Sequence, residues 1–230
     1  MTATKPVRDT ALPSSISHYT TLEGFQGIVE TQSIWASNAS FLNDRTELEH
    51  ALKASKRVIS MFSSDKAQKV WSPLIKQVFK ELLDGAKPDT YVTCFCKDDD
   101  NLSQWRGYSG DLQGINITFN RAKLEDRLKK EKAEFVEVVY SKHSTAAKFR
   151  TSLENEIRDI ADLGKMIGEL SEEERIEELR SRVSALLPRF KHIGFKDERE
   201  WRFAIQKTVE QKSLKFRISK HKRLTHNHLF

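Results

Sequence analysis

Two acidic residues one position apart mark the stretch of this chain that is best suited to chemistry. Glu198 and Glu200 lead into residues 201–206, where apolar and polar side chains alternate with the period of a β-strand. On an extended chain, Glu198, Glu200 and Arg202 would share one face, while aromatic residues anchor the other. A carboxylate held in this way can stabilise a cationic sugar-like transition state. The alternative is an edge strand with solvated charges.

A second group of candidate residues lies at 102–108. This segment places Trp105, Arg106 and Tyr108 in what we interpret as a turn between two strands, where binding residues often concentrate. The guanidinium of Arg106 can hold a phosphate or carboxylate through two hydrogen bonds. The alternative is a salt bridge from Arg106 to Glu198 or Glu200.

A third group, His18, Tyr19 and Thr20, lies where a strand pattern gives way to a helix pattern. A histidine next to an aromatic ring can grip a planar ligand, and the free amides at a helix start can bind phosphate. Thr20 and Glu23 have the spacing of a helix capping box. The alternative is therefore a core histidine beside a capping threonine.

Other motifs do not indicate a site. The C-terminal histidines at 221, 226 and 228 lack cysteines or acids at ligand spacing, so we predict no metal site. We find no phosphate-binding glycine loop, dinucleotide fingerprint or nucleophile elbow. Cys94 and Cys96 lie in an apolar run and indicate buried free thiols in a reducing cytoplasm. Helix capping is sufficient to explain Asn43 and Asp44.

Length and composition indicate one domain of α+β class. The chain has 230 residues, of which 31% are charged, and its net charge of +6 is compatible with an anionic partner without identifying one. We see no secretory signal and no apolar run long enough for a membrane span, so we expect a cytoplasmic protein. Residues 1–15 are expected to be a flexible N-terminal segment, 16–219 a single α+β domain and 220–230 a basic tail.

The expected elements follow from periodicity and capping signals. Strands are predicted at 16–20, 33–36, 91–96, 114–119, 135–140, 200–206 and 214–218. Helices are predicted after Thr20, from 43 or 44 to about 62, at 65–84 and at 121–131. A highly charged helical pair at about 144–187 is expected to be an insertion or lid beside the sheet, with a solvated acidic face.

The ordered motifs resemble a known family. His18-Tyr-Thr20, Ile34-Trp-Ala36 with Phe41-Leu-Asn-Asp44, the 102–108 segment and Phe190–Arg202 occur in the order found in the bacterial family called domain of unknown function 2971. The resemblance covers roughly residues 16–206. The layout is similar to the ADP-ribosyltransferase fold, in which a split β-sheet carries a histidine, an aromatic residue and a glutamate.

The resemblance implies roles for single residues. His18 would bind the ribose next to nicotinamide, with Thr20 beside it at the helix start. Tyr19, Trp105 or Tyr108 would stack on the nicotinamide ring, and Arg106 would contact the pyrophosphate of NAD. Glu200, with Glu198 as its rival, would stabilise the oxocarbenium-like centre as nicotinamide leaves.

The leading hypothesis is an NAD-dependent ADP-ribosyltransferase of toxin or phage-defence type, which modifies an acceptor in DNA, RNA or protein. It requires His18, Trp105 or Tyr108, Arg106 and Glu200 to converge on one pocket. The alternative is a non-catalytic nucleic-acid or protein-binding module, which would show a basic face and salt-dependent binding. A third possibility is a metal-dependent nuclease or hydrolase that uses Glu198, Glu200 and Asp44.

Overall fold

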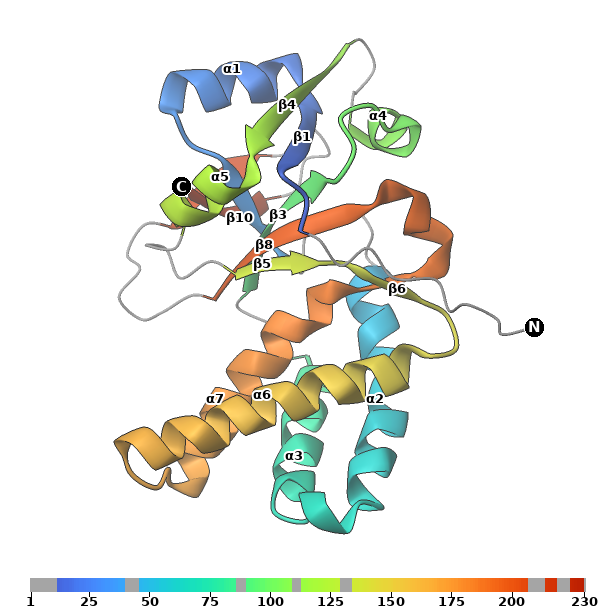
Figure 1. Cartoon of the computed structure of the whole chain (residues 1–230), viewed down its shortest axis with the longest axis vertical. Coiled ribbons are helices and arrows are strands. Elements are labelled where there is room, and N and C mark those ends of the chain that lie inside the picture. Colours follow the sequence, from blue (N-terminus) through green and yellow to red (C-terminus); the bar gives the residue numbers. More distant parts are fainter. Residues whose placement is uncertain are drawn as a thin grey trace, which may run out of the picture.

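The computed structural model describes residues 12–39, 46–85, 90–108, 113–128, 134–206, 214–218 and 224–229. Within these ranges a mostly antiparallel sheet stands above a layer of helices, as Figure 1 shows. The combination of helices with an antiparallel sheet confirms the predicted α+β class. No helix in the described part of the chain is both long and apolar enough to cross a membrane.

The sheet is organised around β3 (Thr90–Cys96). One edge of β3 pairs along its whole length with β8 (Glu200–Gln206), which also pairs with β5 (Glu134–Glu137). The other edge of β3 pairs with β1 (Ser15–Thr21) at Cys96 and with β2 (Trp35–Asn38) at Tyr91 and Val92. The sheet therefore divides into two branches at β3. One branch continues to β4 (Gly114–Asn120), the other to β10 (Leu224–Leu229) and β9 (Leu214–Ile218).

Both faces of β8 are buried. Trp201 and Phe203 pack on one face with Ile16, Phe95 and Leu128. The side chains of Glu200 and Arg202 on the other face are equally buried, because the helical layer covers that side. The edge-strand alternative is therefore wrong, since β8 has a partner strand on each edge.

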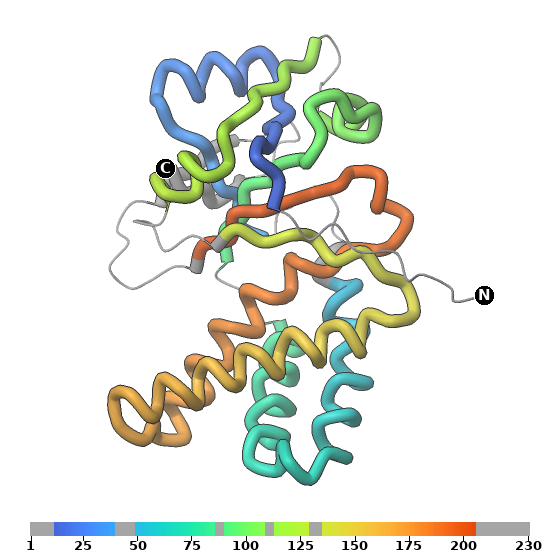
Figure 2. The backbone as a smooth tube through the Cα atoms, in the orientation of Figure 1, coloured from blue at the N-terminus to red at the C-terminus, as the bar shows by residue number. Residues whose placement is uncertain are grey.

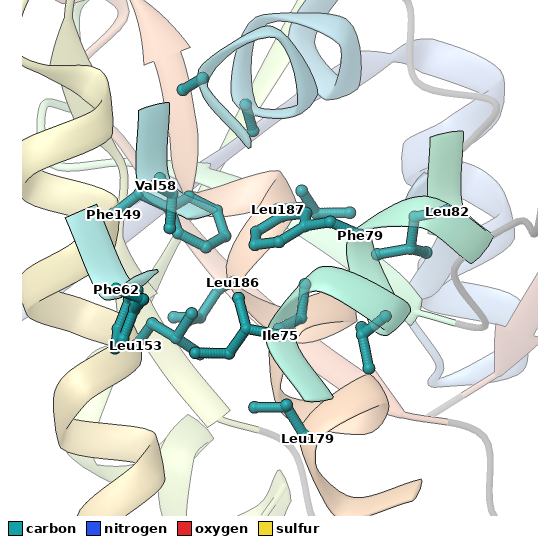
Figure 3. Packing of buried hydrophobic residues seen from close by; sticks show 14 of the residues in the cluster. Val58, Phe62, Ile75, Phe79, Leu82, Phe149, Leu153, Leu179, Leu186 and Leu187 are labelled. Atoms are coloured by element: carbon teal, nitrogen blue, oxygen red, sulfur yellow. The ribbon is translucent and has the colours of Figure 1, made fainter. Parts of the chain in front are cut away.

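The helical layer contains the largest core of the described residues. It consists of α2 (Thr46–Ser63), α3 (Trp71–Leu83), α6 (Thr145–Ile167) and α7 (Glu172–Leu186), whose apolar side chains meet as shown in Figure 3. The predicted lid or insertion at 144–187 is wrong, because α6 and α7 supply eight of the 19 buried residues of this core. In α6 the buried positions recur at helical spacing, as in Phe149, Leu153, Ile157 and Ile160. Charged residues separate these apolar positions in the sequence, so the buried stripe is hard to recognise from the sequence alone.

Shorter elements lie between these strands and helices along the chain, whose path Figure 2 traces. They are α1 (Leu22–Thr31), α4 (Leu102–Tyr108), α5 (Arg121–Leu128), the 3₁₀ turns η2 (Lys66–Gln68), η4 (Leu187–Arg189) and η5 (Ile193–Glu198), and the parallel pair β6 (Val139–Ser141) and β7 (Phe190–His192).

Several local predictions need correction. The 102–108 segment is helix α4 instead of a turn, because the Asn101 side chain accepts hydrogen bonds from the amides of Ser103 (2.9 Å) and Gln104 (3.2 Å). The cap of α1 is Thr21, whose hydroxyl accepts from the Gly24 amide at 3.2 Å, and not Thr20. The predicted 65–84 helix divides into η2 and α3, and the 135–140 strand divides into β5 and β6.

The predicted basic tail at 220–230 contains an element of the sheet. β10 pairs with β2 through Leu229↔Trp35, His228↔Ala36 and Asn227↔Ser37, and with β9 on its other edge. The domain therefore extends to Leu229, because β10 completes an edge of β2 that would otherwise stay unpaired. The predicted flexible segment up to residue 11, the capping pair Asn43 and Asp44, and His221 lie outside the described residues.

Candidate functional site

Four charged residues meet where β8 faces the helical layer. The Nζ atom of Lys191 lies 2.5 Å from Glu198 Oε2 and 3.1 Å from Glu200 Oε2. Arg202 Nη2 lies 2.8 Å from the same oxygen of Glu200. We call Lys191, Glu198, Glu200 and Arg202 the carboxylate cluster. It joins η5, β7 and β8, and one ammonium group bridges both predicted catalytic carboxylates.

The two carboxylates differ in accessibility. The side chain of Glu198 is 19% exposed, whereas those of Glu200 and Lys191 are 1% and 4% exposed. Burial alone would raise the pKa of Glu200, but the charges of Arg202 and Lys191 outweigh it and lower that pKa. Glu200 is therefore an ionised internal group, and Glu198 is the carboxylate that a ligand can reach.

Backbone groups fix the cluster between the two layers. The Glu200 amide donates to the Tyr140 hydroxyl at 2.8 Å, and the Glu200 carbonyl accepts from the Val138 amide at 3.1 Å. Arg202 Nη1 donates to the carbonyl of Pro188, which belongs to η4 below the sheet. The cluster therefore connects the sheet to the helical layer.

Helix α4 and the residue that caps it are hydrogen-bonded to the backbone of η5, next to the carboxylate cluster. Gln104 Nε2 donates to the Glu198 carbonyl at 2.9 Å, and Asn101 Nδ2 donates to the Asp197 carbonyl at 2.7 Å. The pKa of Tyr108 is raised well above its usual range, first by burial and then by the charges of Cys94 and Glu200. The Tyr108 phenol is therefore a neutral group in the neighbourhood of the carboxylate cluster.

Tyr19 and Trp105 form an aromatic pair on this side of the sheet. Their ring centroids lie 4.7 Å apart in an edge-to-face arrangement. The Tyr19 hydroxyl donates to the Asp98 carbonyl at 3.0 Å and accepts from the Asn101 amide at 2.9 Å, and burial raises its pKa to about 12. Tyr19 thus anchors the start of α4, and Trp105 Nε1 donates to Asp100 Oδ1 at 2.8 Å.

Arg106 projects from α4 as an exposed side chain. Within the described ranges it forms no ion pair, so the predicted alternative of a salt bridge to Glu198 or Glu200 is absent there. Its guanidinium is available to an anionic ligand at the exposed surface of α4.

His18 lies on the opposite face of the sheet from Glu200. Ser17 is paired with Cys96, and Cys96 with Glu200, so these three side chains share one face and His18, next to Ser17, occupies the other. The His18 ring lies 5.6 Å from Phe95, and its Nδ1 hydrogen-bonds the Cys94 carbonyl at 2.9 Å. Burial lowers the pKa of His18. Thr20, two residues along β1, lies on the His18 face.

The predicted convergence is therefore only partial. Tyr19, Trp105 and Tyr108 lie on the same side of the sheet as Glu198 and Glu200. Arg106 lies on the exposed face of α4, and His18 and Thr20 are separated from the two acids by the sheet. Sequence reasoning missed Lys191 and Tyr140. Lys191 lies inside the Phe190–Arg202 motif, but a lysine in a three-residue strand gives no periodic signal of burial.

The described residues contain no group of three or more histidine, cysteine or acidic side chains that could hold a metal ion. The metal-dependent hypothesis also required Asp44, which lies outside the described residues.

Comparison with known proteins gives one match. Residues 104–203 match the family model described as "Protein of unknown function (DUF2971)". The match runs from α4 to β8, includes the whole carboxylate cluster and supports the family resemblance seen in the motifs. No curated protein and no solved structure matches the chain.

Proposed function

We propose that this chain is an NAD-dependent ADP-ribosyltransferase whose site is centred on the carboxylate cluster. The observation that carries the proposal is the meeting of Glu198 and Glu200 on Lys191, beside the helix that bears Trp105 and Arg106. Perturbed titratable groups held together at a junction between layers are typical of catalytic sites.

The exposures assign different roles to the two acids. Glu198, with 19% of its side chain exposed, would act on the ligand, and Glu200, with 1%, would position it through the shared ammonium of Lys191. This choice reverses the order in which the two acids were ranked from the sequence.

The proposed reaction uses the two acids in these roles. The bond between C1′ of the ribose and the nicotinamide nitrogen breaks, and nicotinamide leaves with the bonding electron pair. Glu198 stabilises the positive charge that develops at C1′. The acceptor nucleophile then bonds to C1′ and gives its proton to Glu198. Tyr108 and Trp105 would lie against the nicotinamide ring, and Arg106 would bind the pyrophosphate.

The revised site has no place for His18 and Thr20, since they lie across the sheet. Support for the fold part of the proposal comes from the division of the sheet at β3, which is compatible with a split β-sheet. The acceptor would be a nucleic acid or protein in the bacterial cytoplasm, as expected for a toxin or phage-defence effector.

The test is NAD-dependent nicotinamide release by the purified chain. We expect Glu198→Gln to lower the rate about 100-fold, because an amide cannot stabilise the cationic centre as a carboxylate does. Asp162→Asn, which removes an exposed acid from α6, should leave the rate unchanged. Equal rates in Glu198→Gln and the wild type, or no release by the folded wild type with candidate acceptors, would favour the non-catalytic nucleic-acid or protein-binding module.

A further inference from the structure

A basic pocket lies at the end of the helical layer farthest from the sheet, at the turn between α2 and α3 (Figure 1). Its volume is about 590 Å³, and it is lined by Ser63, Asp65, Lys66, Lys69, Ser72, Pro73 and Lys76. We call it the lysine pocket. None of its lining residues belongs to the carboxylate cluster or to α4.

The three lysines of this pocket carry uncompensated charge. Lys66, Lys69 and Lys76 are all exposed, and within the described ranges none of them forms an ion pair. Two exposed lysines elsewhere in the helical layer do form ion pairs, Lys53 with Glu49 and Lys165 with Asp162.

The single acid that lines the pocket, Asp65, is paired with Arg150, a guanidinium that it shares with Glu154. Asp65 Oδ2 lies 2.6 Å from Arg150 Nη2, and Asp65 Oδ1 accepts from the Ala67 amide at 3.0 Å to cap η2. Both carboxylate oxygens of Asp65 therefore have partners outside the pocket lysines, one on α6 and one in the backbone of η2. The lysine pocket retains the positive charge of three ammonium groups in one concave surface.

Two hydroxyl groups complete the lining. Ser63 Oγ and Ser72 Oγ lie 3.0 Å apart and bring the ends of α2 and α3 together. Hydroxyl and ammonium groups are donors that suit phosphate oxygens. The lining includes no aromatic or carboxamide side chain that would read a base. The chemistry therefore favours recognition of phosphate groups alone.

We propose that the lysine pocket binds clustered phosphate groups. The same chemistry is offered by a free polyphosphate and by the backbone of a nucleic acid. The proposal goes beyond the transferase function and does not depend on it, because the pocket shares no lining residue with the carboxylate cluster.

The experiment titrates the full chain separately with tripolyphosphate and with a labelled single-stranded DNA, at several salt concentrations. Lys69→Ala/Lys76→Ala is the test variant, and Lys69→Arg/Lys76→Arg keeps the charge. Lys123→Ala/Lys142→Ala removes the same charge from exposed positions elsewhere. Thermal unfolding of each variant checks that it is folded.

We expect the alanine pocket variant to bind tripolyphosphate at least about tenfold more weakly, and the other two variants to bind it like the wild type. If nucleic acid is the source, DNA binding weakens in parallel, and the slope of log K against log salt falls by about 2. Loss of tripolyphosphate binding without any DNA binding identifies a free polyphosphate. No tripolyphosphate binding by the wild type, or equal losses in the alanine pocket variant and the alanine control, would overturn the proposal.

Discussion

Lys191 is the central residue of the carboxylate cluster, because its buried ammonium contacts two carboxylates of different exposure. Buried charges are tolerated only when they are paired and hydrogen-bonded, and this cluster meets that condition in part. Arg202 pairs with Glu200 and donates to the Pro188 carbonyl, but within the described ranges Glu200 Oε1 and Arg202 Nε are buried without a hydrogen-bond partner. The same contacts that hold Glu198 in place thus connect the sheet to the helices.

Removing one cation from this cluster should destabilise the protein strongly. We predict that Arg202→Met lowers the free energy of unfolding by about 3–5 kcal/mol, because Glu200 keeps its buried charge and loses its nearest guanidinium. Urea unfolding measures the change. The matched control, Lys165→Met in an exposed pair on α6, should change it by less than about 0.5 kcal/mol. Similar losses in both variants would show that Arg202 is not a buried structural charge.

The partly buried histidines predict a pH dependence of stability. Burial is the main cause that lowers the pKa of His50, and the charges of His192 and, more weakly, of Lys53 lower it further. A hydrogen bond to the Ser141 backbone raises this pKa but does not outweigh them. The His50 ring also hydrogen-bonds Thr145 at 3.1 Å. The pKa of His18 is lowered by burial. The unfolded chain then binds more protons than the folded chain at low pH, so stability is full above the unfolded pKa of 6.5 and falls as the pH drops below it.

Urea unfolding at about pH 7.5 and about pH 5.5 measures this effect above the range in which carboxylates titrate. We expect lower stability at the lower pH, and a smaller loss in His50→Gln, which cannot be protonated. A loss of stability that is the same in His50→Gln and the wild type would contradict the assignment to His50.

At the scale of elements, the helical pair α6–α7 is a structural part of the helical core. Leu153 of α6 is fully buried among residues of α2, α3 and α7. We predict that Leu153→Ala lowers the free energy of unfolding by about 2–5 kcal/mol, because it leaves a cavity in this core. Met166→Ala, at a side chain that is 84% exposed near the end of the same helix, should have little effect in the same urea titration. A small effect of Leu153→Ala would restore the view of α6–α7 as a detachable lid.

The elements that the sequence predicted well are those with a strong local signal. The strands at 91–96, 114–119 and 214–218 and the strand start at Glu200 appear within a residue or two of their expected bounds, because alternation and flanking turns mark them. Helix α4 was missed because it is only seven residues long and depends on a cap at Asn101. Strand β10 was missed because its residues are mostly polar and gain order by pairing with β2, which is distant in sequence.

The candidate site shows the same limit. The sequence indicated Glu198, Glu200, Trp105, Arg106 and Tyr108, and these residues do lie on one side of the sheet. The face of His18 depended on the register between β1 and β3, in which a shift of one residue would reverse every side chain. Composition and spacing within one segment do not define a register between two segments.

At the scale of the whole molecule, the chain combines two layers with separate candidate sites. The carboxylate cluster lies where the sheet meets the helices, and the lysine pocket lies at the opposite end of the helical layer (Figure 1). The basic pocket can therefore bind a phosphate-bearing partner without covering the carboxylate cluster. This arrangement would suit an enzyme whose acceptor is a large anionic molecule.

The central claim is that the α4 side of the sheet binds NAD, and calorimetric titration of NAD into the purified full chain tests it most directly. We predict saturable NAD binding by the wild type. Arg106→Ala should bind NAD at least about tenfold more weakly, because it loses the pyrophosphate contact. His18→Gln should bind NAD like the wild type, because His18 lies on the other face of the sheet. The absence of saturable binding by the folded wild type, or its loss in His18→Gln with Arg106→Ala unaffected, would contradict the account.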